Sequence, residues 1–258
     1  MLDEDSLRAG LPIAWIGENF YFHQSIDSTN AEGNRLAKEG APHGTLIVAN
    51  EQRAGRGRAG RRWITAPDSA IAMSIVVRPD QILANDWQKV NAIAALAVVK
   101  VLEDYGLSAE IKWPNDVLLD GKKVAGILLE GVWRADQAEF AVLGIGVNVK
   151  KRSLPSLNLL NFPATYIMET STQPIARDEL LFAILRALVA WIDRLNTDEL
   201  TVNLNKHLAF VNQTVVIDND PQLGGKLLGV DDEGRLRIII QGEELVLGYE
   251  HSSLRLKS

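Results

Sequence analysis

The feature that most restricts the fold of this chain is a run of glycine and arginine between two apolar segments of strand length. Five arginines fall within residues 53–62, and three glycines are interleaved with them: Gly55, Gly57 and Gly60. Charge of this density has to lie at the surface, and glycine lets a backbone adopt positive φ and approach a ligand closely. Thr45–Ala49 (TLIVA) and Ala70–Val77 (AIAMSIVV) on either side read as buried strands. The pattern predicts strand, loop, strand, with an anion such as phosphate at the loop.

The same loop matches G-x-G-x-x-G, a spacing found in several nucleotide-binding folds. A dinucleotide-binding fold needs a helix after the loop, and here a strand follows Trp63. A protein kinase needs later H-R-D and D-F-G motifs, which are absent from the sequence, as is a G-x-x-x-x-G-K-[ST] loop. Side-chain charge would therefore have to hold the phosphate. A solvated basic loop, or one that binds nucleic acid, fits this segment by itself equally well.

Composition narrows the class of protein. The chain has 258 residues, 47% of them hydrophobic, a formal net charge of −6 and no cysteine. The lack of cysteine excludes disulfides, thiolate metal sites and cysteine nucleophiles. The acidic N-terminus does not resemble a signal peptide, and the longest apolar stretch, Ala92–Val99, is too short to span a bilayer. We expect a cytoplasmic protein without membrane association, and the acidic balance argues against general affinity for nucleic acid.

Helices and strands alternate up to about residue 210, and the pattern then changes. Helices are predicted at Ala31–Glu39, Ala84–Tyr105 and Arg177–Leu195, and further strands at Glu110–Trp113, Val117–Leu119, Val124–Leu129 and Phe140–Val149. Thr29 and Glu32 fit a capping box at the first helix, and Gly40 fits its end. Asp120-Gly121 is a strong hairpin signal. Lys151–Pro174 is rich in loops. After Val211, short strands with glycine turns resemble a small barrel of about five strands.

Three further motifs carry polar groups, and each also has a purely structural interpretation. In Lys112-Trp-Pro-Asn-Asp116, lysine could neutralise phosphate and aspartate could bind Mg²⁺, although Pro-Asn-Asp is also turn chemistry. Lys123 precedes an apolar strand that contains Gly126, which indicates close approach of a ligand or another backbone. Gly144, Gly146 and Asn148 repeat the pattern in the next strand, where we favour a site.

Two other polar sets are less specific. Ser28-Thr29-Asn30 is typical of a helix cap, but it could also hydrogen-bond a small polar ligand at the start of the helix. The four histidines lie far apart in sequence without ligand-like spacing, so we predict no histidine metal site.

In their order along the chain, these motifs closely resemble those of the biotin protein ligases (biotin–[acetyl-CoA-carboxylase] ligases). The motifs are Asp27-Ser-Thr-Asn30, Gln52 with Gly55-Arg-Gly-Arg-x-Gly60 and Trp63, Lys112-Trp-Pro-Asn-Asp116, Lys123-x-Ala-Gly126 and Gly144-x-Gly-x-Asn148. The resemblance covers about Phe20 to Asn148. About 26 residues precede the first motif, too few for the winged-helix DNA-binding domain that some members carry, so we expect the catalytic-only type that does not bind DNA.

The resemblance implies an α+β fold. A mixed central β-sheet flanked by helices, of the class II synthetase-like and lipoate-ligase-like kind, would form a catalytic domain over residues 1–209. A small SH3-like β-barrel would occupy residues 210–258. The implied reaction converts biotin and Mg·ATP to biotinyl-5′-AMP and pyrophosphate, and then transfers biotin to a lysine of the biotin carboxyl carrier protein of acetyl-CoA carboxylase. Exposed edge strands could pair in a homodimer.

The resemblance also assigns roles to residues. Those implied to line the biotin pocket are Ser28, Thr29, Asn30, Gln52, Gly55, Arg56, Gly57, Arg58, Lys123 and Gly126. Those implied to bind ATP are Arg58, Arg61, Trp63, Lys112, Asn115, Asp116 and Asn148, with Trp63 stacked on adenine and Asn148 hydrogen-bonded to it. Arg58 and Lys123 are implied to be catalytic, Asp116 to bind Mg²⁺, and Arg255 to reach ATP.

Two other functions remain open on the sequence. A lipoate ligase or octanoyl transferase would share the catalytic fold, although its own arginine-glycine and histidine motifs are not found here. A non-enzymatic nucleic-acid-binding module could use the basic loop and the small barrel, and it would bind oligonucleotides in a salt-dependent way.

Overall fold

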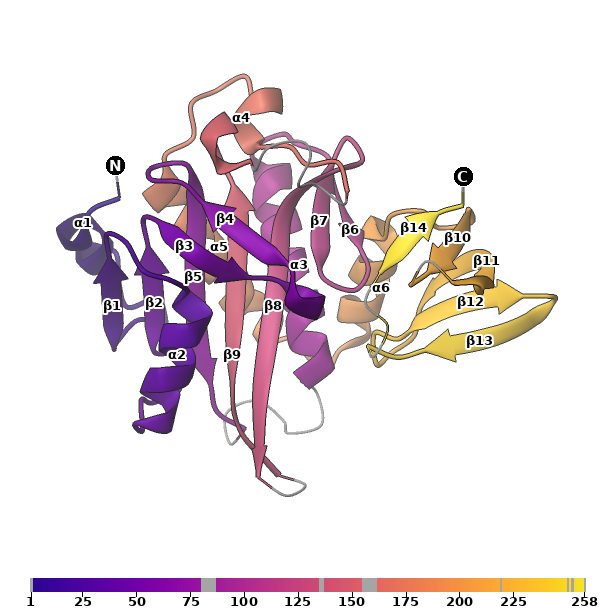
Figure 1. Ribbon diagram of the computed structural model, residues 1–258, viewed down its shortest axis with the longest axis horizontal. Helices are drawn as coiled ribbons and strands as arrows, with labels where there is room; N and C mark the ends of the chain where they lie inside the picture. The colour runs from indigo at the N-terminus through magenta and orange to yellow at the C-terminus, as the bar shows by residue number, and fades with distance from the viewer. Residues whose placement is uncertain are drawn as a thin grey trace.

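A mixed seven-stranded sheet forms the centre of the computed structural model, which describes residues 2–79, 87–134, 137–154, 162–218, 220–249, 251 and 253–257. The strand order is β1-β2-β5-β9-β8-β7-β6 (Figure 1). The strands are β1 (Phe20–His23), β2 (Leu46–Ala49), β5 (Ala70–Val77), β6 (Ala109–Lys112), β7 (Asp116–Leu119), β8 (Lys122–Arg134) and β9 (Gln137–Asn148). β1 and β2 are parallel, and the other neighbouring pairs are antiparallel. The predicted α+β fold with a mixed central sheet is confirmed.

Helices cover the two faces of the sheet unequally. α3 (Trp87–Asp104) and α5 (Arg177–Ile192) pack on one face, and α2 (Thr29–Lys38) packs on the other (Figure 1). Because side chains alternate along a strand, neighbouring residues of β9 enter different clusters. Ala141 and Leu143 join the large core with α3, whereas Phe140 and Val142 join a smaller cluster with Leu36 of α2.

The face of β9 that packs against α2 carries large apolar side chains first and glycines further along the strand. After Phe140 and Val142, the same face presents Gly144, Gly146 and Asn148. No large side chain stands there, and the arginine segment crosses that part of the sheet as a hairpin of β3 (Gln52–Arg56) and β4 (Arg62–Thr65) (Figure 1). The period-two pattern of β9 thus opens a space between the sheet and the hairpin.

The arginine segment, predicted as a loop, has regular structure. It is a two-stranded hairpin whose tip is a short 3₁₀ turn, η1 (Arg58–Gly60). Positive φ occurs at Gly60 (72°) and at Ala59 (53°), while Gly57 is extended at −128°. Gly55 is required for another reason, because a Cβ there would lie 2.3 Å from the carbonyl oxygen of Trp63.

Most predicted elements in the first 200 residues are present with boundaries shifted by a few residues. The predicted helix from Ala84 begins at Trp87, with residues 84–86 outside the described part, and the third predicted helix ends at Ile192 rather than Leu195. The hairpin at Asp120-Gly121 is confirmed, since φ is 48° and 70° there, as a type I′ turn requires.

The predicted capping box is wrong. Ser28 is the N-cap of α2 and accepts a hydrogen bond from Ala31 N at 3.3 Å. Thr29 is already the first helical residue, and its hydroxyl instead donates to Gln52 Oε1 at 3.0 Å and accepts from Ser74 Oγ at 2.7 Å. The predicted helix end is confirmed, because Gly40 follows the C-cap with φ 94°.

Several short elements were not predicted. They are α1 (Glu4–Ala9), β1, η2 (Lys151–Ser153), α4 (Ile167–Thr170) and α6 (Asp198–His207). Most of these span only three to six residues, too few for a periodic pattern. Part of the loop-rich stretch predicted at Lys151–Pro174, residues 155–161, lies outside the described residues.

The C-terminal segment forms a separate antiparallel sheet of five strands in the order β13-β12-β11-β10-β14. The strands are β10 (Thr214–Ile217), β11 (Asp220–Val230), β12 (Leu236–Ile240), β13 (Glu243–Leu247) and β14 (Leu254–Leu256). The predicted number of strands is confirmed. β13 and β14 are the two ends of the hydrogen-bonded order, so closure into an SH3-like barrel stays a prediction. Among the helices of the described residues, none is long and apolar enough to cross a bilayer.

Candidate active site

A cavity of about 400 Å³ lies between the β3–β4 hairpin and the open part of the sheet. It brings together segments that are far apart in sequence. All the site residues predicted from the sequence line it except Gly55, and Arg255 also lines it. Lining residues that the sequence motifs did not single out include Arg62, Met73, Ser153, Phe162 and Ser253.

One end of the cavity is polar and built of neutral side chains. Gln52 Oε1 accepts hydrogen bonds from Thr29 N at 2.8 Å and from Thr29 Oγ1 at 3.0 Å. The Gln52 amide nitrogen in turn donates to Thr65 Oγ1 at 3.4 Å. These side chains are buried, as is Ser28 beside them. The start of α2 and the first strand of the hairpin are therefore locked together, with polar atoms held in fixed directions.

Asn30 extends this network to the floor of the cavity. Its Oδ1 lies 2.6 Å from Ser74 Oγ, and its amide nitrogen donates to Leu128 O at 3.2 Å and to Glu130 Oε2 at 2.8 Å. A Cβ on Gly144 would lie 2.1 Å from Asn30 Oδ1, so this glycine makes room for the asparagine. The motifs missed Ser74 and Glu130. The signal for Ser74 was a lone hydroxyl inside an apolar strand.

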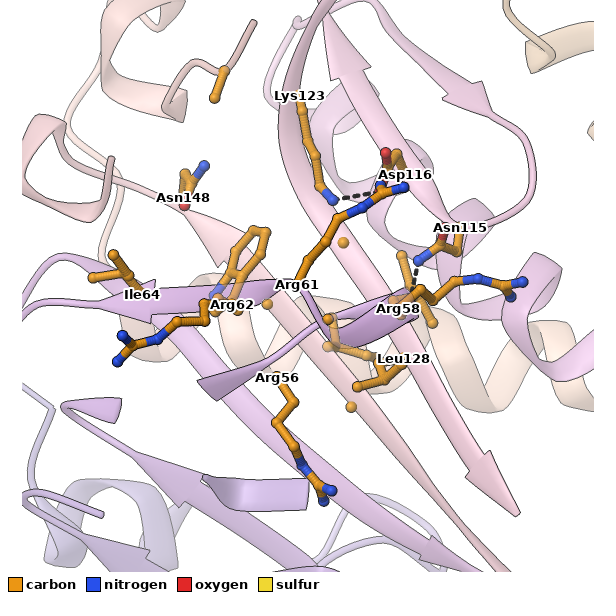
Figure 2. Close-up of a pocket in the computed structure, with 18 of the residues that line it drawn as sticks. Arg56, Arg58, Arg61, Arg62, Ile64, Asn115, Asp116, Lys123, Leu128 and Asn148 are labelled. Atoms are coloured by element: carbon orange, nitrogen blue, oxygen red, sulfur yellow. Dashed lines mark hydrogen bonds and ion pairs between the residues drawn. The ribbon is translucent and has the colours of Figure 1, made fainter. Parts of the chain in front are cut away.

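Arg56 also lies at this end of the cavity rather than at the cationic end, and a carboxylate balances its charge there. Its guanidinium pairs with Glu130 Oε2 at 3.1 Å, and both side chains are partly exposed. Figure 2 shows Arg56 pointing away from Lys123 and Asp116. Glu130 thereby holds both Asn30 and Arg56.

The other end of the cavity carries a cluster of two lysines and one aspartate. Asp116 Oδ1 lies 2.5 Å from Lys123 Nζ, and Asp116 Oδ2 lies 3.3 Å from Lys112 Nζ (Figure 2). Lys112 Nζ also lies 4.8 Å from the centre of the Phe162 ring, within cation–π range. Arg61 extends from the hairpin towards this cluster (Figure 2). The cluster keeps a net positive charge, to which Arg61 adds.

Burial and charge act against each other in this cluster. Burial raises the pKa of Asp116, but the charges of Lys123 and Lys112 outweigh it, so the pKa of this carboxyl lies below its usual value. Burial lowers the pKa of the Lys112 ammonium, and the charge of Asp116 opposes that shift. Asp116 therefore remains an anion that keeps two cations in place in a site with little water.

Trp63 lies over the paired glycines of β8 and β9. A Cβ on Gly146 would be 2.6 Å from Trp63 Cε2, and one on Gly126 would be 3.3 Å from Trp63 Cζ3. The glycines predicted to allow close approach of a ligand thus make room for a side chain of the same chain. In the described part of the chain, the indole N–H of Trp63 is buried without a hydrogen-bond partner.

Two predicted ATP-binding asparagines hold the backbone around the cluster. The Asn115 amide nitrogen donates to Ile127 O at 2.6 Å, and Ile127 N donates to Asn115 O at 2.9 Å, which ties the turn to β8. The Asn148 amide nitrogen donates to Thr165 O at 3.1 Å. Thr165 N in turn donates to Lys123 O at 2.9 Å, so Asn148 and Lys123 are held by the same segment.

Arg58 reaches out of the cluster to the C-terminal sheet. Its guanidinium donates to Tyr249 O at 2.8 Å and to His251 O at 3.1 Å. Burial lowers the pKa of Arg58. The N–H groups of Arg58 are therefore directed at backbone carbonyls of the connection between β13 and β14, and its predicted catalytic role stays a prediction.

The described residues contain no group of three or more histidine, cysteine, aspartate or glutamate side chains that could hold a metal ion. Both Asp116 oxygens already pair with lysines. Among the described residues, the carboxylate predicted to bind Mg²⁺ is therefore engaged by two cations and stands outside any cluster of metal-binding side chains.

The fold and cavity indicate an enzyme for anionic substrates, and comparison with known proteins defines its class. Residues 22–148 match the Biotin/lipoate A/B protein ligase family. The chain is 33% identical over 248 residues to the bifunctional ligase/repressor BirA of Bacillus subtilis, covering 91% of this chain and 74% of the relative. It is 33% identical over 223 residues to the biotin–[acetyl-CoA-carboxylase] ligase of Paracoccus denitrificans, covering 81% and 90%.

A solved structure agrees with these relatives. The biotin protein ligase of Aquifex aeolicus in complex with biotin and ATP superposes with a TM-score of 0.78 at 26% identity, covering 93% of this chain and 100% of the other. The chain belongs to the biotin protein ligase family, as its motifs predicted.

Proposed function

We propose that this protein uses ATP to join biotin to a lysine of a biotin carboxyl carrier protein, that of acetyl-CoA carboxylase. The observation that carries the proposal is one cavity with a neutral polar end and a cationic end. Biotin has the same polarity, with an uncharged ureido ring at one end and a carboxylate at the other. The names of the relatives support this choice of substrates.

The neutral end is proposed to hold the ureido ring. That ring has a carbonyl that accepts hydrogen bonds and two N–H groups that donate them. Hydroxyl and amide side chains can match both, and Ser28, Thr29 and Gln52 are already oriented by bonds to one another or to α2. Preorganised partners lose little freedom when the ligand binds.

The cationic end is proposed to carry out the first step. A carboxylate oxygen of biotin attacks the α-phosphorus of ATP, and the bond to pyrophosphate breaks to give biotinyl-5′-AMP. Two anions have to approach each other, so fixed cations are needed to offset their repulsion. Lys123 and Lys112 are fixed by Asp116, and Arg61 and Arg58 lie on the hairpin above.

In the second step, a neutral lysine amine of the carrier attacks the carbonyl carbon of the mixed anhydride. AMP leaves, and the amine loses a proton as the amide forms. The anhydride must be protected from water meanwhile. The β3–β4 hairpin is placed to cover it, with Trp63 beside Gly146 as the proposed adenine platform and Asn148 as its hydrogen-bond partner.

Mg²⁺ is proposed to enter with the phosphates of ATP rather than on a site made by the protein. It would neutralise phosphate charge when bound. Asp116, whose oxygens pair with Lys112 and Lys123, is better suited to hold those lysines than to coordinate a metal.

We also propose a catalytic domain over residues 1–209 and an SH3-like domain over 210–258.

The experiment that tests the function is ATP-dependent transfer of radiolabelled biotin to a purified carboxyl carrier domain, with AMP and pyrophosphate as the other products. Lipoate and octanoate in place of biotin test the alternative from the same family. Transfer of lipoate or octanoate faster than biotin would overturn the proposal. No transfer of biotin in the presence of ATP would do the same.

A further inference from the structure

The tip of the arginine hairpin is fastened to the C-terminal sheet. Arg58, in η1, donates to the carbonyl oxygens of Tyr249 and His251 at 2.8 and 3.1 Å. Both acceptors lie between β13 and β14, and Figure 1 shows the β3–β4 hairpin with its tip turned towards the C-terminal sheet. The position of the Arg58 side chain thus depends on a segment that lies almost two hundred residues further along the chain.

Asp218 fixes the position of these acceptors. It lies between β10 and β11, and its Oδ2 is 2.9 Å from His251 Nδ1. Its Oδ1 accepts from Ser253 N at 2.8 Å, and its own N donates to Ser253 O at 3.0 Å. The carboxylate therefore binds the residues on both sides of position 252 to the end of β10.

The backbone at Asp218 restricts which residues can do this. Its φ is 50°, in the left-handed region, where aspartate, asparagine and glycine are tolerated and most other residues are strained. Among these three, aspartate and asparagine have a side-chain oxygen that can accept from Ser253 N. The negative charge of Asp218 also attracts Arg58 through space.

We propose that Asp218 is a positioning residue for the active-site hairpin. It holds the carbonyl oxygens that bind Arg58, and through Arg58 it keeps the tip of the hairpin over the cavity. This inference rests on the proposed function where it concerns the reaction. If the hairpin retains biotinyl-AMP, then Asp218 controls how long the adenylate is retained, although Asp218 does not touch the substrate.

Three variants of the full chain test this. Asp218→Gly removes the carboxylate without strain at positive φ. Asp218→Asn keeps an acceptor for Ser253 N and should behave much more like wild type. Gln241→Gly is the matched control, because Gln241 is an exposed residue at φ 53° in the turn between β12 and β13 of the same sheet.

The first readout is trypsin cleavage of the unliganded protein, mapped by mass spectrometry. We expect cleavage after Arg56, Arg61 and Arg62 to be at least about fivefold faster in Asp218→Gly, because local opening of the hairpin becomes easier. Cleavage after the exposed Lys38 in α2 and Lys206 in α6 is the reference for local opening outside the hairpin, and it should not change. Equal hairpin cleavage in Asp218→Gly and wild type, in Asp218→Gly and Gln241→Gly, or in Asp218→Gly and Asp218→Asn overturns the proposal.

A double-mutant cycle shows whether Asp218 acts through Arg58. In an Arg58→Ala background, Asp218→Gly should add little further cleavage after Arg61 and Arg62, because the contact is already lost. Additive effects of the two substitutions overturn the proposal. This readout does not need biotin, so it is independent of whether the proposed function is correct.

The second readout is dissociation of biotinyl-AMP, measured by stopped flow. We expect release several-fold faster in Asp218→Gly than in wild type, while Gln241→Gly is unchanged. If Asp218→Gly releases biotinyl-AMP at the wild-type rate although its hairpin is cleaved faster, then Asp218 has no role in retention of the adenylate. Failure of all variants and of wild type to form the adenylate contradicts the proposed function instead, and the cleavage results then still decide whether Asp218 positions the hairpin.

Discussion

At the residue scale, the strand glycines show how one signal can have two meanings. Gly126, Gly144 and Gly146 indicated close approach to the strand, and the approach is real. The groups that approach are Asn30, Lys123 and Trp63 of the same chain. Glycine here allows polar and aromatic side chains to lie flat on a sheet, and those side chains then line the cavity.

Gly146→Ala should therefore disturb Trp63. The new Cβ would lie 2.6 Å from Trp63 Cε2, so the indole has to move, and overpacking of this kind destabilises by about 1–3 kcal/mol. Urea denaturation measures the free energy of unfolding. Gly57→Ala is the control, because its Cβ would be 3.5 Å from the nearest atom. Equal stability of the two variants would contradict the packing described here.

Lys123→Ala tests the cationic end of the cavity. Loss of one fixed charge at the reacting phosphate should slow adenylation by roughly 10²-fold or more. Biotin-dependent exchange of pyrophosphate into ATP measures this step without the carrier. Lys122→Ala is the control, since Lys122 is an exposed neighbour that does not line the cavity. A near-normal exchange rate in Lys123→Ala would rule out its role.

At the scale of elements, local signals located the helices and strands better than they located the caps and the hairpin. Ser28, Thr29 and Asn30 all suit a helix start, and the choice of Ser28 as cap depends on Gln52 and Ser74, which bind Thr29 from other strands. In the same way, the arginine loop becomes a hairpin because β3 and β4 pair across it. The propensity of a residue for a helix cap or a loop depends on its neighbours in sequence, so it cannot predict contacts with other strands.

The connection between α2 and β2 carries a titrating group. His43 stacks on Trp15 with ring centres 4.2 Å apart, and its Nδ1 accepts from Arg78 N at 3.1 Å. Burial, and then the charge of Arg78, lower the pKa of His43 from 6.5 to about 4. The native state therefore favours the neutral ring, and its contribution to stability is full above pH 6.5.

That contribution should be lost as the pH falls from about 6.5 towards 4, because the unfolded chain then binds a proton that the folded chain excludes. Over this window, wild type should lose roughly 1–2 kcal/mol more of its free energy of unfolding than His43→Asn, because water still reaches part of the His43 ring and screens its charge. The asparagine can accept from Arg78 N and does not titrate. Denaturant unfolding at several pH values measures the difference, and parallel curves for the two proteins would refute it.

At the scale of the whole molecule, one apolar core runs from the central sheet into the C-terminal sheet. It contains Ile111 and Leu208 on one side and Val215, Leu227 and Ile238 on the other. Trp113 also donates from its indole N–H to Gly234 O at 3.1 Å, and its ring lies 5.5 Å from that of Tyr249. The two proposed domains are therefore tightly coupled.

We expect the protein to unfold in one transition, because neither sheet can lose its partner without exposing part of this core. Calorimetric and van't Hoff enthalpies should be about equal. Leu227→Ala should destabilise by about 2–5 kcal/mol and shift the whole transition, not a part of it. Two separate transitions, with only the smaller one sensitive to Leu227→Ala, would contradict this coupling. The homodimer suggested by edge strands stays a prediction.

The sequence by itself determined the family, the mixed sheet and the five C-terminal strands, and nearly all of the site residues that it predicted line the cavity. It could do so because spacing and residue chemistry are local properties, and several motifs in one order are specific together. The tertiary structure decided what each residue contacts. Asp116 pairs with two lysines, Glu130 joins Asn30 to Arg56, and Arg58 reaches a sheet that lies far along the chain. Those pairings depend on which strands become neighbours, and that is fixed only when the whole core packs.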